Sequence, residues 1–233
     1  MGELASKQGV GERIARALRS SIVRGRLKPG DALPSERDLA EKYAVNRSSI
    51  REAMTRLEAW GLVQIRQGGI TRVSDFLLSA GLDLLPHLVG AGGKVDPSIL
   101  GDLHEIRSML LGWCGEQAAR KADAASVTRL DDLVRRMGDA KGRASTLQEL
   151  DYDFFQELVN ISGNRVLGLF TNVLRDIYLN GRERFLPLYG KGVFDLLHHR
   201  RAVEAIRARD VAAAGQALRA HADTARLTIG ERR

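Results

Sequence analysis

The sequence predicts a mainly helical protein, with an N-terminal winged helix-turn-helix followed by an all-helical bundle. Three observations support this prediction. Apolar residues recur at helical spacing in three short segments near the start of the chain. Two short runs of β-forming residues follow, separated by a turn that contains glycines. After about residue 76 there is almost no strand signal, and helical patterns continue toward the end of the chain.

The first expected helix covers residues 9–25, where apolar residues form one stripe and Gly25 suits the C-terminal end. After a loop with two prolines, Ser35 is the expected N-cap of a second helix, because Asp38 three residues later gives a capping-box-like start. Asn46 is the expected N-cap of a third helix. Two short helices joined by so tight a turn are typical of a helix-turn-helix.

After Gly61 the pattern changes from helix to strand. The β-forming segments LVQI and ITRV flank the turn RQGG, which predicts a hairpin with Gly68 and Gly69 at its tip. An isolated hairpin is marginal in water, so this one is expected to pack on the helices as a wing. We therefore expect residues 1–75 to form a winged helix-turn-helix DNA-binding domain.

The remainder of the chain is expected to be a junction followed by a helical domain. Residues 76–97 contain glycines and prolines and suit a junction, and residues 98–233 show successive helical stripes. The expected helices cover about 98–121, 125–141, 145–162, 164–187, 192–208 and 210–230. The candidate N-caps are Ser98, Ser126, Ser145 and Asp210.

The charge is unevenly distributed along the chain, whose formal net charge is +7. Residues 1–75 contain 14 Lys or Arg and 9 Asp or Glu, whereas the rest contains 22 and 20. This excess indicates a polyanionic partner, although a basic solvated surface explains it equally well. One cysteine, no signal-peptide pattern and no apolar run of about 18 residues favour a soluble cytoplasmic protein without a membrane partner.

The third expected helix carries a polar side that suits double-stranded DNA. Arg47 and Arg51 lie four residues apart, away from the apolar stripe, and Ser48 lies near them. Arginine can donate two hydrogen bonds to guanine in the major groove, and serine can donate to phosphates. The alternative is a solvated helix face. The candidate DNA-binding residues are Arg37, Asn46, Arg47, Ser48, Ser49, Arg51, Gln67 and Gly68.

The segment PSERDLAEKYAVNRSSIREAMTRLEAWGLV resembles the GntR family of bacterial transcription regulators almost residue for residue. The resemblance implies that Arg37, Arg47, Arg51 and Gly68 contact operator DNA. The segments LHEIRSMLLGWCGEQAARKAD and ELDYDFFQELVNISGN resemble the ligand-sensing FCD domain of the FadR subfamily. This resemblance implies an effector-responsive repressor that acts as a homodimer on a near-palindromic operator.

Many members of that subfamily bind a divalent metal with one aspartate and three histidines. Asp151, His199 and His221 match three of these positions, and Phe155 replaces the first histidine. Zinc can accept three protein ligands plus water, whereas an apolar ring at this position favours a different, metal-free pocket. The sequence leaves the cofactor unknown, with zinc as one alternative.

The expected effector is a carboxylate metabolite or an acyl-CoA. Arg107 matches an arginine that many FCD domains point toward a carboxylate, and its alternative is a surface ion pair with Glu105. Tyr178 lies on a helix that could line the same pocket. The candidate effector-binding residues are Arg107, Asp151, Phe155, Tyr178, His199 and His221.

The alternative function is a metal-dependent enzyme that uses Asp151, His199 and His221. Such an enzyme also needs a base or a nucleophile at the site. The sequence contains no glycine-rich phosphate loop, serine-nucleophile elbow or metalloprotease histidine pair. The basic winged module would also have no role in an enzyme, so we expect a regulator without catalytic activity.

Overall fold

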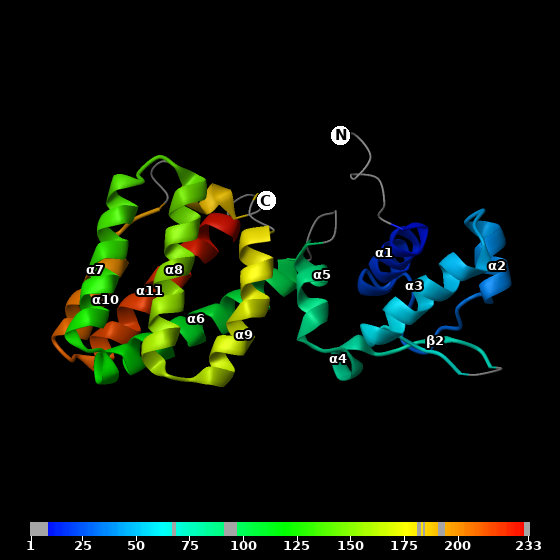
Figure 1. Ribbon diagram of the computed structural model, residues 1–233, viewed down its shortest axis with the longest axis horizontal. Coiled ribbons are helices and arrows are strands. Elements are labelled where there is room, and N and C mark those ends of the chain that lie inside the picture. Colours follow the sequence, from blue (N-terminus) through cyan, green and yellow to red (C-terminus); the bar gives the residue numbers. More distant parts are fainter. Residues whose placement is uncertain are drawn as a thin grey trace. The chain divides into compact units, whose positions relative to one another are not determined.

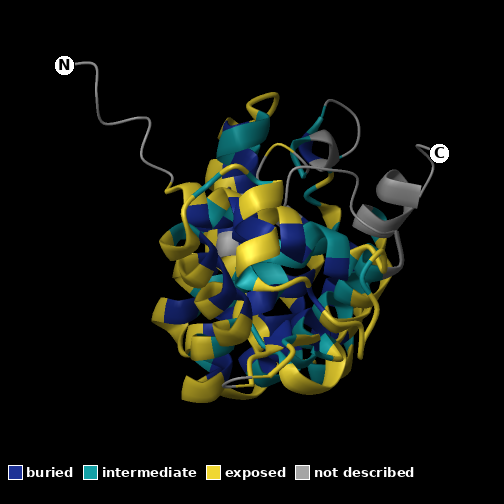
Figure 2. Ribbon diagram, turned by 90° about the vertical axis from the view of Figure 1, so that its right-hand side faces the viewer, coloured by how far each residue is buried: buried dark blue, intermediate teal, exposed yellow. Residues whose placement is uncertain are grey.

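The computed structural model describes residues 9–66, 69–90, 97–180, 183, 185–190 and 194–230 (Figure 1). The chain forms two compact units, Met1–Gly93 and Lys94–Arg233. Exposed residues lie on the outer faces of the helices that Figure 2 shows, and buried residues lie between the helices. Among the described helices, none has the length and apolar character that a membrane span requires.

The first unit contains the expected three helices and hairpin. The helices are α1 (Val10–Val23), α2 (Glu36–Lys42) and α3 (Arg47–Ala59), and the strands are β1 (Val63–Gln64) and β2 (Arg72–Val73). The two strands are antiparallel, with Val63 opposite Val73. Both valines are buried, so the hairpin packs against the helices and the predicted winged helix-turn-helix is confirmed. Its core includes Ile14, Leu18, Leu39, Ile50, Leu57 and Leu62.

The turn between α2 and α3 is fixed by local hydrogen bonds. The Ser35 hydroxyl accepts the N–H of Asp38 at 3.2 Å, and the Asn46 side chain accepts the N–H of Ser49 at 2.8 Å. Both predicted N-caps are therefore confirmed. Ala44, in the turn, has a φ of 51°, a left-handed conformation that is uncommon for alanine.

The segment expected as a junction begins with short helices that belong to the first unit. They are α4 (Phe76–Ser79), the 3₁₀ turn η1 (Leu82–Leu84) and α5 (Leu85–Gly90). Gly61, just after α3, has a φ of 68°, and a Cβ there would lie 2.5 Å from the Ser79 carbonyl oxygen. Glycine at this position therefore allows the end of α3 to approach α4 closely.

The second unit is the predicted helical bundle. Its main helices are α6 (Pro97–Lys121), α7 (Ala124–Asp139), α8 (Ala144–Ser162), α9 (Arg165–Arg175), α10 (Leu197–Arg207) and α11 (Val211–Gly230). In the bundle, α6 packs along α11, and α8 packs on both α6 and α7 (Figure 1). A Cβ at Gly115 would lie 2.6 Å from the Leu218 side chain, so this glycine permits the close approach of α6 and α11.

Several details of the bundle differ from the predictions, and Ser98, expected as a cap, lies inside α6. The single helix expected over 164–187 is wrong, because α9 ends at Arg175 and is followed by the π-helical turn η2 (Asp176–Asn180) and the 3₁₀ turn η4 (Leu186–Tyr189). Asp123, rather than Ser126, caps α7, since its carboxylate accepts the Ser126 N–H at 2.7 Å. Ser145 lies inside α8 and is not its cap. Asp210 does cap α11, by accepting the Ala213 N–H at 3.0 Å.

Candidate functional site

The predicted DNA-binding side chains at the starts of α2 and α3 are mostly exposed. Arg37 is 76% exposed, and Arg47 and Ser48 are also exposed. Arg51 is 70% exposed, and its Nε lies 2.9 Å from an oxygen of Glu36, the first residue of α2. Helix N-termini attract phosphates, and exposed arginines add positive charge there. This surface is therefore chemically suited to a nucleic-acid backbone.

Other predicted members of this surface differ in their roles or lie outside the described residues. Asn46 is exposed, but its side-chain oxygen is engaged as the N-cap of α3. Ser49 is half-buried and supplies the capped N–H. Gln67 and Gly68 lie outside the described residues.

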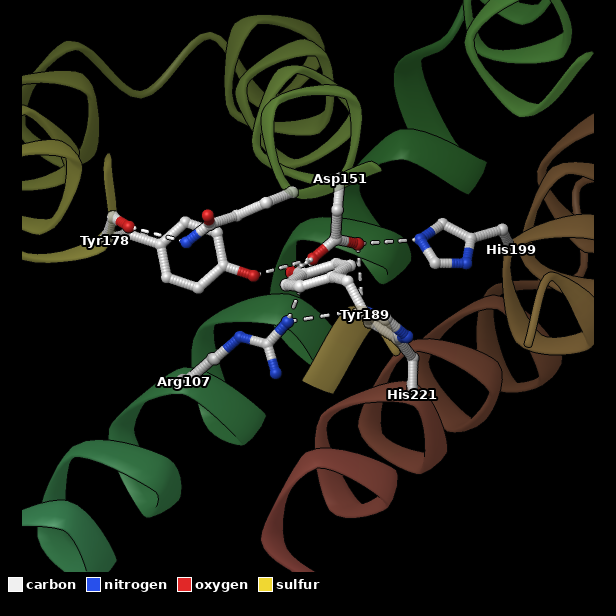
Figure 3. A network of polar contacts seen from close by, with 7 residues as sticks. Arg107, Asp151, Tyr178, Tyr189, His199 and His221 are labelled. Carbon is white, nitrogen blue, oxygen red and sulfur yellow. Dashed lines mark hydrogen bonds and ion pairs between the residues drawn. The ribbon is translucent and has the colours of Figure 1, made fainter. Parts of the chain in front are cut away.

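A second cluster of polar residues surrounds the buried carboxylate of Asp151 in α8 (Figure 3). One of its oxygens, Oδ2, accepts hydrogen bonds from Tyr189 at 2.6 Å and Tyr178 at 3.1 Å, and Arg107 lies 3.4 Å away. The other oxygen, Oδ1, lies 2.8 Å from the Nε2 of His199 and 3.0 Å from the Nε2 of His221. Five side chains from five different elements therefore converge on one carboxylate.

The irregular segment after α9 supplies two of these five partners. Tyr178 belongs to the π-helical turn η2, and Gln148 in α8 donates to its backbone oxygen at 2.7 Å. Tyr189 is the last residue of η4 and is buried. In a continuous α-helix the two tyrosines would lie about 16 Å apart along the axis, whereas here both contact the same carboxylate. The deviation from the predicted helix therefore builds the site.

The ionisation of the cluster follows from burial and from its hydrogen bonds. Burial alone would raise the pKa of Asp151, but the charge interaction with His221 and the hydrogen bonds of the two histidines outweigh it and hold the pKa well below its usual value. Burial, together with the Asp151 charge, raises the pKa of Tyr178 well above its usual value. Burial lowers the pKa of His221 to about 4. At neutral pH the carboxylate is therefore ionised, whereas the Tyr178 phenol and the His221 imidazole are neutral.

His221 cannot satisfy both of its neighbours at once. Its Nε2 lies 3.0 Å from Asp151 Oδ1 and 3.2 Å from the Nη2 of Arg107. The carboxylate requires a proton on this nitrogen, whereas the guanidinium requires a lone pair. When His221 donates to Asp151, the Arg107 Nη2 therefore has no hydrogen-bond acceptor at His221.

A cavity of about 120 Å³ lies beside the cluster, well above the roughly 10–15 Å³ that one water needs. Arg107, Asp151, Tyr178 and His221 contribute to its wall, and so does Phe155. Most of the remaining wall is aliphatic or aromatic. It includes Leu100, Leu103, Ile106, Leu110, Leu174, Ile177 and Phe185. An apolar cavity with a few convergent polar groups is typical of a small-molecule site.

Comparison with known proteins identifies both parts of the chain. Residues 10–73 match the bacterial regulatory proteins of the gntR family, and residues 102–224 match the FCD domain. The chain belongs to the GntR family. It is 36% identical over 173 residues to the HTH-type transcriptional regulator Mce2R of Mycobacterium tuberculosis. The aligned segment covers 74% of this chain and 72% of that protein.

A second relative of this GntR regulator agrees with that assignment, and a solved structure shares its fold. The fatty acid metabolism regulator protein of Klebsiella pneumoniae is 32% identical over 166 residues, or 71% of this chain and 68% of the relative. Lar of Listeria monocytogenes has the same fold, with a TM-score of 0.52 and 14% identity over 96% of this chain and 97% of that one. The chain is therefore a DNA-binding transcription regulator and not an enzyme, as the sequence predicted.

The cluster of this GntR regulator resembles a metal site only in part. One donor atom each of Asp151, His199 and His221 lies within 4.8 Å of the others. However, Phe155 offers no donor, and the Arg107 guanidinium brings positive charge within 3.4 Å of two of these atoms. The Nδ1 of His199 is buried without a partner in the described part of the chain, whereas a metal-bound histidine usually donates its second N–H. The arrangement therefore does not fit a divalent ion.

Two members of the site were not predicted from the sequence. Tyr189 donates the shortest hydrogen bond to Asp151, at 2.6 Å, and His104 lines the cavity three residues before Arg107. Helical spacing gave a usable signal for His104, because residues three apart share a helix face. Tyr189 gave no periodic signal, since it lies in a short 3₁₀ turn between irregular segments.

Proposed function

We propose that this regulator binds a near-palindromic operator as a homodimer and releases it when a carboxylate metabolite or an acyl-CoA enters the cavity. In this proposal residues 1–75 are the DNA-binding domain, residues 76–97 the junction and residues 98–233 the effector-binding and dimerisation domain. The observation that carries the proposal is the set of exposed arginines at the starts of α2 and α3. Action on DNA also implies a cytoplasmic location.

The start of α3 supports contact with base edges. Arg47 is the first residue of the helix and Arg51 lies one turn further, so both can enter a major groove from the same end of α3. Ser48, Ser49, Asn46 and Arg37 are the proposed neighbouring contacts to phosphates and bases. Gln67 and Gly68 are the proposed contacts of the wing. Two such units related by two-fold symmetry would read two half-sites.

The bundle supports the effector half of the proposal. Arg107 is 30% exposed and lines the cavity with Asp151 and His221, rather than facing only solvent. A guanidinium in an apolar cavity suits a carboxylate ligand. The name of the Klebsiella relative, a fatty acid metabolism regulator, supports an acyl compound. A ligand that binds one arrangement of the dimer more tightly than the other would shift the DNA affinity. The shift is limited by the difference between its two binding free energies.

The test begins with selection of an operator from random double-stranded DNA, followed by fluorescence anisotropy with the selected site. We expect Arg47→Ala to cost about 1–3 kcal/mol of operator binding and to reduce the salt dependence by about one ion. Arg120→Ala, at an exposed position of α6, removes the same charge outside the proposed surface and should bind like the wild type. Unchanged affinity in both Arg47→Ala and Arg51→Ala would overturn the assignment of α3.

The homodimer is tested by native mass spectrometry of the purified protein. We expect the mass of two chains at micromolar concentration, with or without DNA. A single chain in the free protein, and one chain on a full operator, would contradict the proposed symmetry.

A further inference from the structure

We propose that the effector of this regulator is a monocarboxylate with an apolar body, and that it binds without a metal ion. In this inference the Arg107 guanidinium supplies the positive charge that a metal would otherwise bring to the cluster. The inference rests on the proposed function of the cavity as the effector site. It narrows the effector from carboxylates and acyl-CoA in general to one chemical class.

Arg107 has hydrogen-bond donors that the described residues do not use. Its Nη2 lies 3.4 Å from Asp151 and 3.2 Å from His221, and its other two nitrogens make no hydrogen bond with the described residues. Figure 3 shows the second terminal nitrogen without a dashed line and directed away from Asp151. Guanidinium–carboxylate hydrogen bonds are usually 2.7–2.9 Å long, about half an ångström shorter than this contact. Arg107 is therefore only weakly engaged by the protein and can take a second carboxylate.

The charge of Asp151 is stabilised by groups other than Arg107. Its two oxygens already accept hydrogen bonds from Tyr178 and Tyr189 and contact His199 and His221, apart from any contribution of Arg107. The carboxylate therefore stays stabilised when Arg107 turns toward a ligand. Because these four groups already surround it, Asp151 also has little capacity left for a metal ion.

The lining of the cavity limits the number of negative charges that a ligand can carry. Arg107 is the one Lys or Arg among the described lining residues, and His104 is already paired with Asp223 at 3.2 Å. A buried anion without a partner is strongly unfavourable. A dicarboxylate or a group with several phosphates would leave negative charge unpaired in this cavity. Because Asp151 keeps its own hydrogen bonds, Arg107 can pair with one ligand carboxylate, and a second carboxylate would find no cation among the described lining residues.

The apolar part of the wall determines which ligand bodies the cavity favours. Away from Arg107, the wall is formed by side chains such as Leu103, Leu110, Phe155, Leu174 and Ile177. These groups offer no hydrogen bonds to hydroxyl groups, so a sugar acid, whose hydroxyl groups extend along its body, would lose hydration there without compensation. An alkyl or aryl body is instead favoured by removal of its apolar surface from water.

The test uses the full chain after treatment with EDTA. Straight-chain carboxylates from butanoate to dodecanoate and phenylacetate are the probes, with the primary alcohol of each length, succinate and octanoyl-CoA as comparisons. We expect at least one monocarboxylate to raise the melting temperature and to bind in calorimetry. The matched alcohol and succinate should bind at least about tenfold more weakly, and added zinc should not strengthen binding.

Variants assign the effect to Arg107. Arg107→Gln should weaken the best carboxylate about tenfold or more, and Arg107→Lys should retain part of the binding because it keeps the charge. Arg120→Gln, an exposed change on the same helix, should bind like the wild type. Circular dichroism checks that each variant is folded. If Arg107→Gln is unfolded, the comparison of carboxylate with alcohol in the wild type still decides the matter.

Several results would overturn the inference. They are no response to any monocarboxylate, equal binding of the alcohol, a requirement for zinc, or binding of octanoyl-CoA without binding of any free carboxylate. Operator binding by the ligand-free wild type is measured in parallel. If the protein binds its operator but no monocarboxylate, this inference fails and the proposed DNA binding stands. If it does not bind DNA, the proposed function fails whatever the ligand result.

Discussion

The Nε of Arg51 lies 2.9 Å from the carboxylate of Glu36, so an ion pair joins the second turn of α3 to the first residue of α2. Both side chains are substantially exposed, at 70% and 42%, and such pairs contribute little to stability. The pair nevertheless holds the Arg51 side chain in one orientation, toward Glu36. A side chain that is already oriented loses less conformational entropy when it contacts a base.

Glu36→Gln tests that orientation. The change removes a negative charge near DNA, so we expect tighter binding to unrelated DNA, while the preference for the operator falls about two- to fivefold. The measurement is competition anisotropy with operator and scrambled DNA. Glu12→Gln breaks a comparable exposed ion pair with Arg16 on α1 and serves as the control. An operator preference in Glu36→Gln equal to that of the control would mean that Glu36 does not position Arg51.

Tyr189→Phe tests the stability of the cluster around Asp151. The variant loses a buried hydrogen bond of 2.6 Å to an ionised carboxylate, and we expect a loss of about 1.5–3 kcal/mol in the free energy of unfolding. Urea unfolding of Trp60→Phe protein isolates the bundle, since Trp113 in α6 is then the one remaining tryptophan. Tyr178→Phe, whose hydrogen bond is 3.1 Å, should lose less. A loss below about 0.5 kcal/mol in Tyr189→Phe would contradict this account.

Most of the fold could be predicted from local patterns in the sequence. The apolar stripes of α1 and α3 determine which faces they bury, and Ser35 and Asn46 fix the starts of α2 and α3 through hydrogen bonds within three residues. Such signals depend on neighbours in the sequence and can be read without the tertiary structure. The prediction of Ser126 as the N-cap of α7 was wrong. Asp123, three residues earlier, is the cap, because its carboxylate accepts the N–H of Ser126.

The site around Asp151 was predictable only in part. His199 and His221 were expected near Asp151 through the family resemblance, and the structure brings them within 3.0 Å of it. Tyr189 was missed because its contact joins residues 38 positions apart through an irregular segment. No periodicity predicts such a pair. The predicted end of the helix that begins near residue 164 was wrong for the same reason. Tertiary hydrogen bonds, rather than local propensity, fix the conformation of η2 after α9.

Cys114 provides a test of packing at the centre of the bundle. The side chain is fully buried in α6, and burial raises the pKa of the thiol to about 12. The thiolate is the reactive form, so we expect very slow reaction with Ellman's reagent at pH 8 and rapid reaction in urea. Because this is the sole cysteine, Cys114→Ser gives the zero signal. Rapid reaction of the native protein would show that the bundle opens around α6.

Phe155→His tests whether the ring at this position is what excludes a metal. Position 155 is one turn after Asp151 on α8 and lines the same cavity, so the introduced imidazole would join Asp151, His199 and His221 as a fourth donor. A complete tetrahedral shell binds zinc far better than three donors beside a guanidinium. We expect the variant to retain about one zinc per chain in native mass spectrometry, and the wild type much less. Phe170→His places an imidazole on α9 outside the cavity lining and should gain none. Stoichiometric zinc in the wild type would contradict the metal-free site, and equal zinc in both variants would mean that the ring at position 155 is not what excludes a metal.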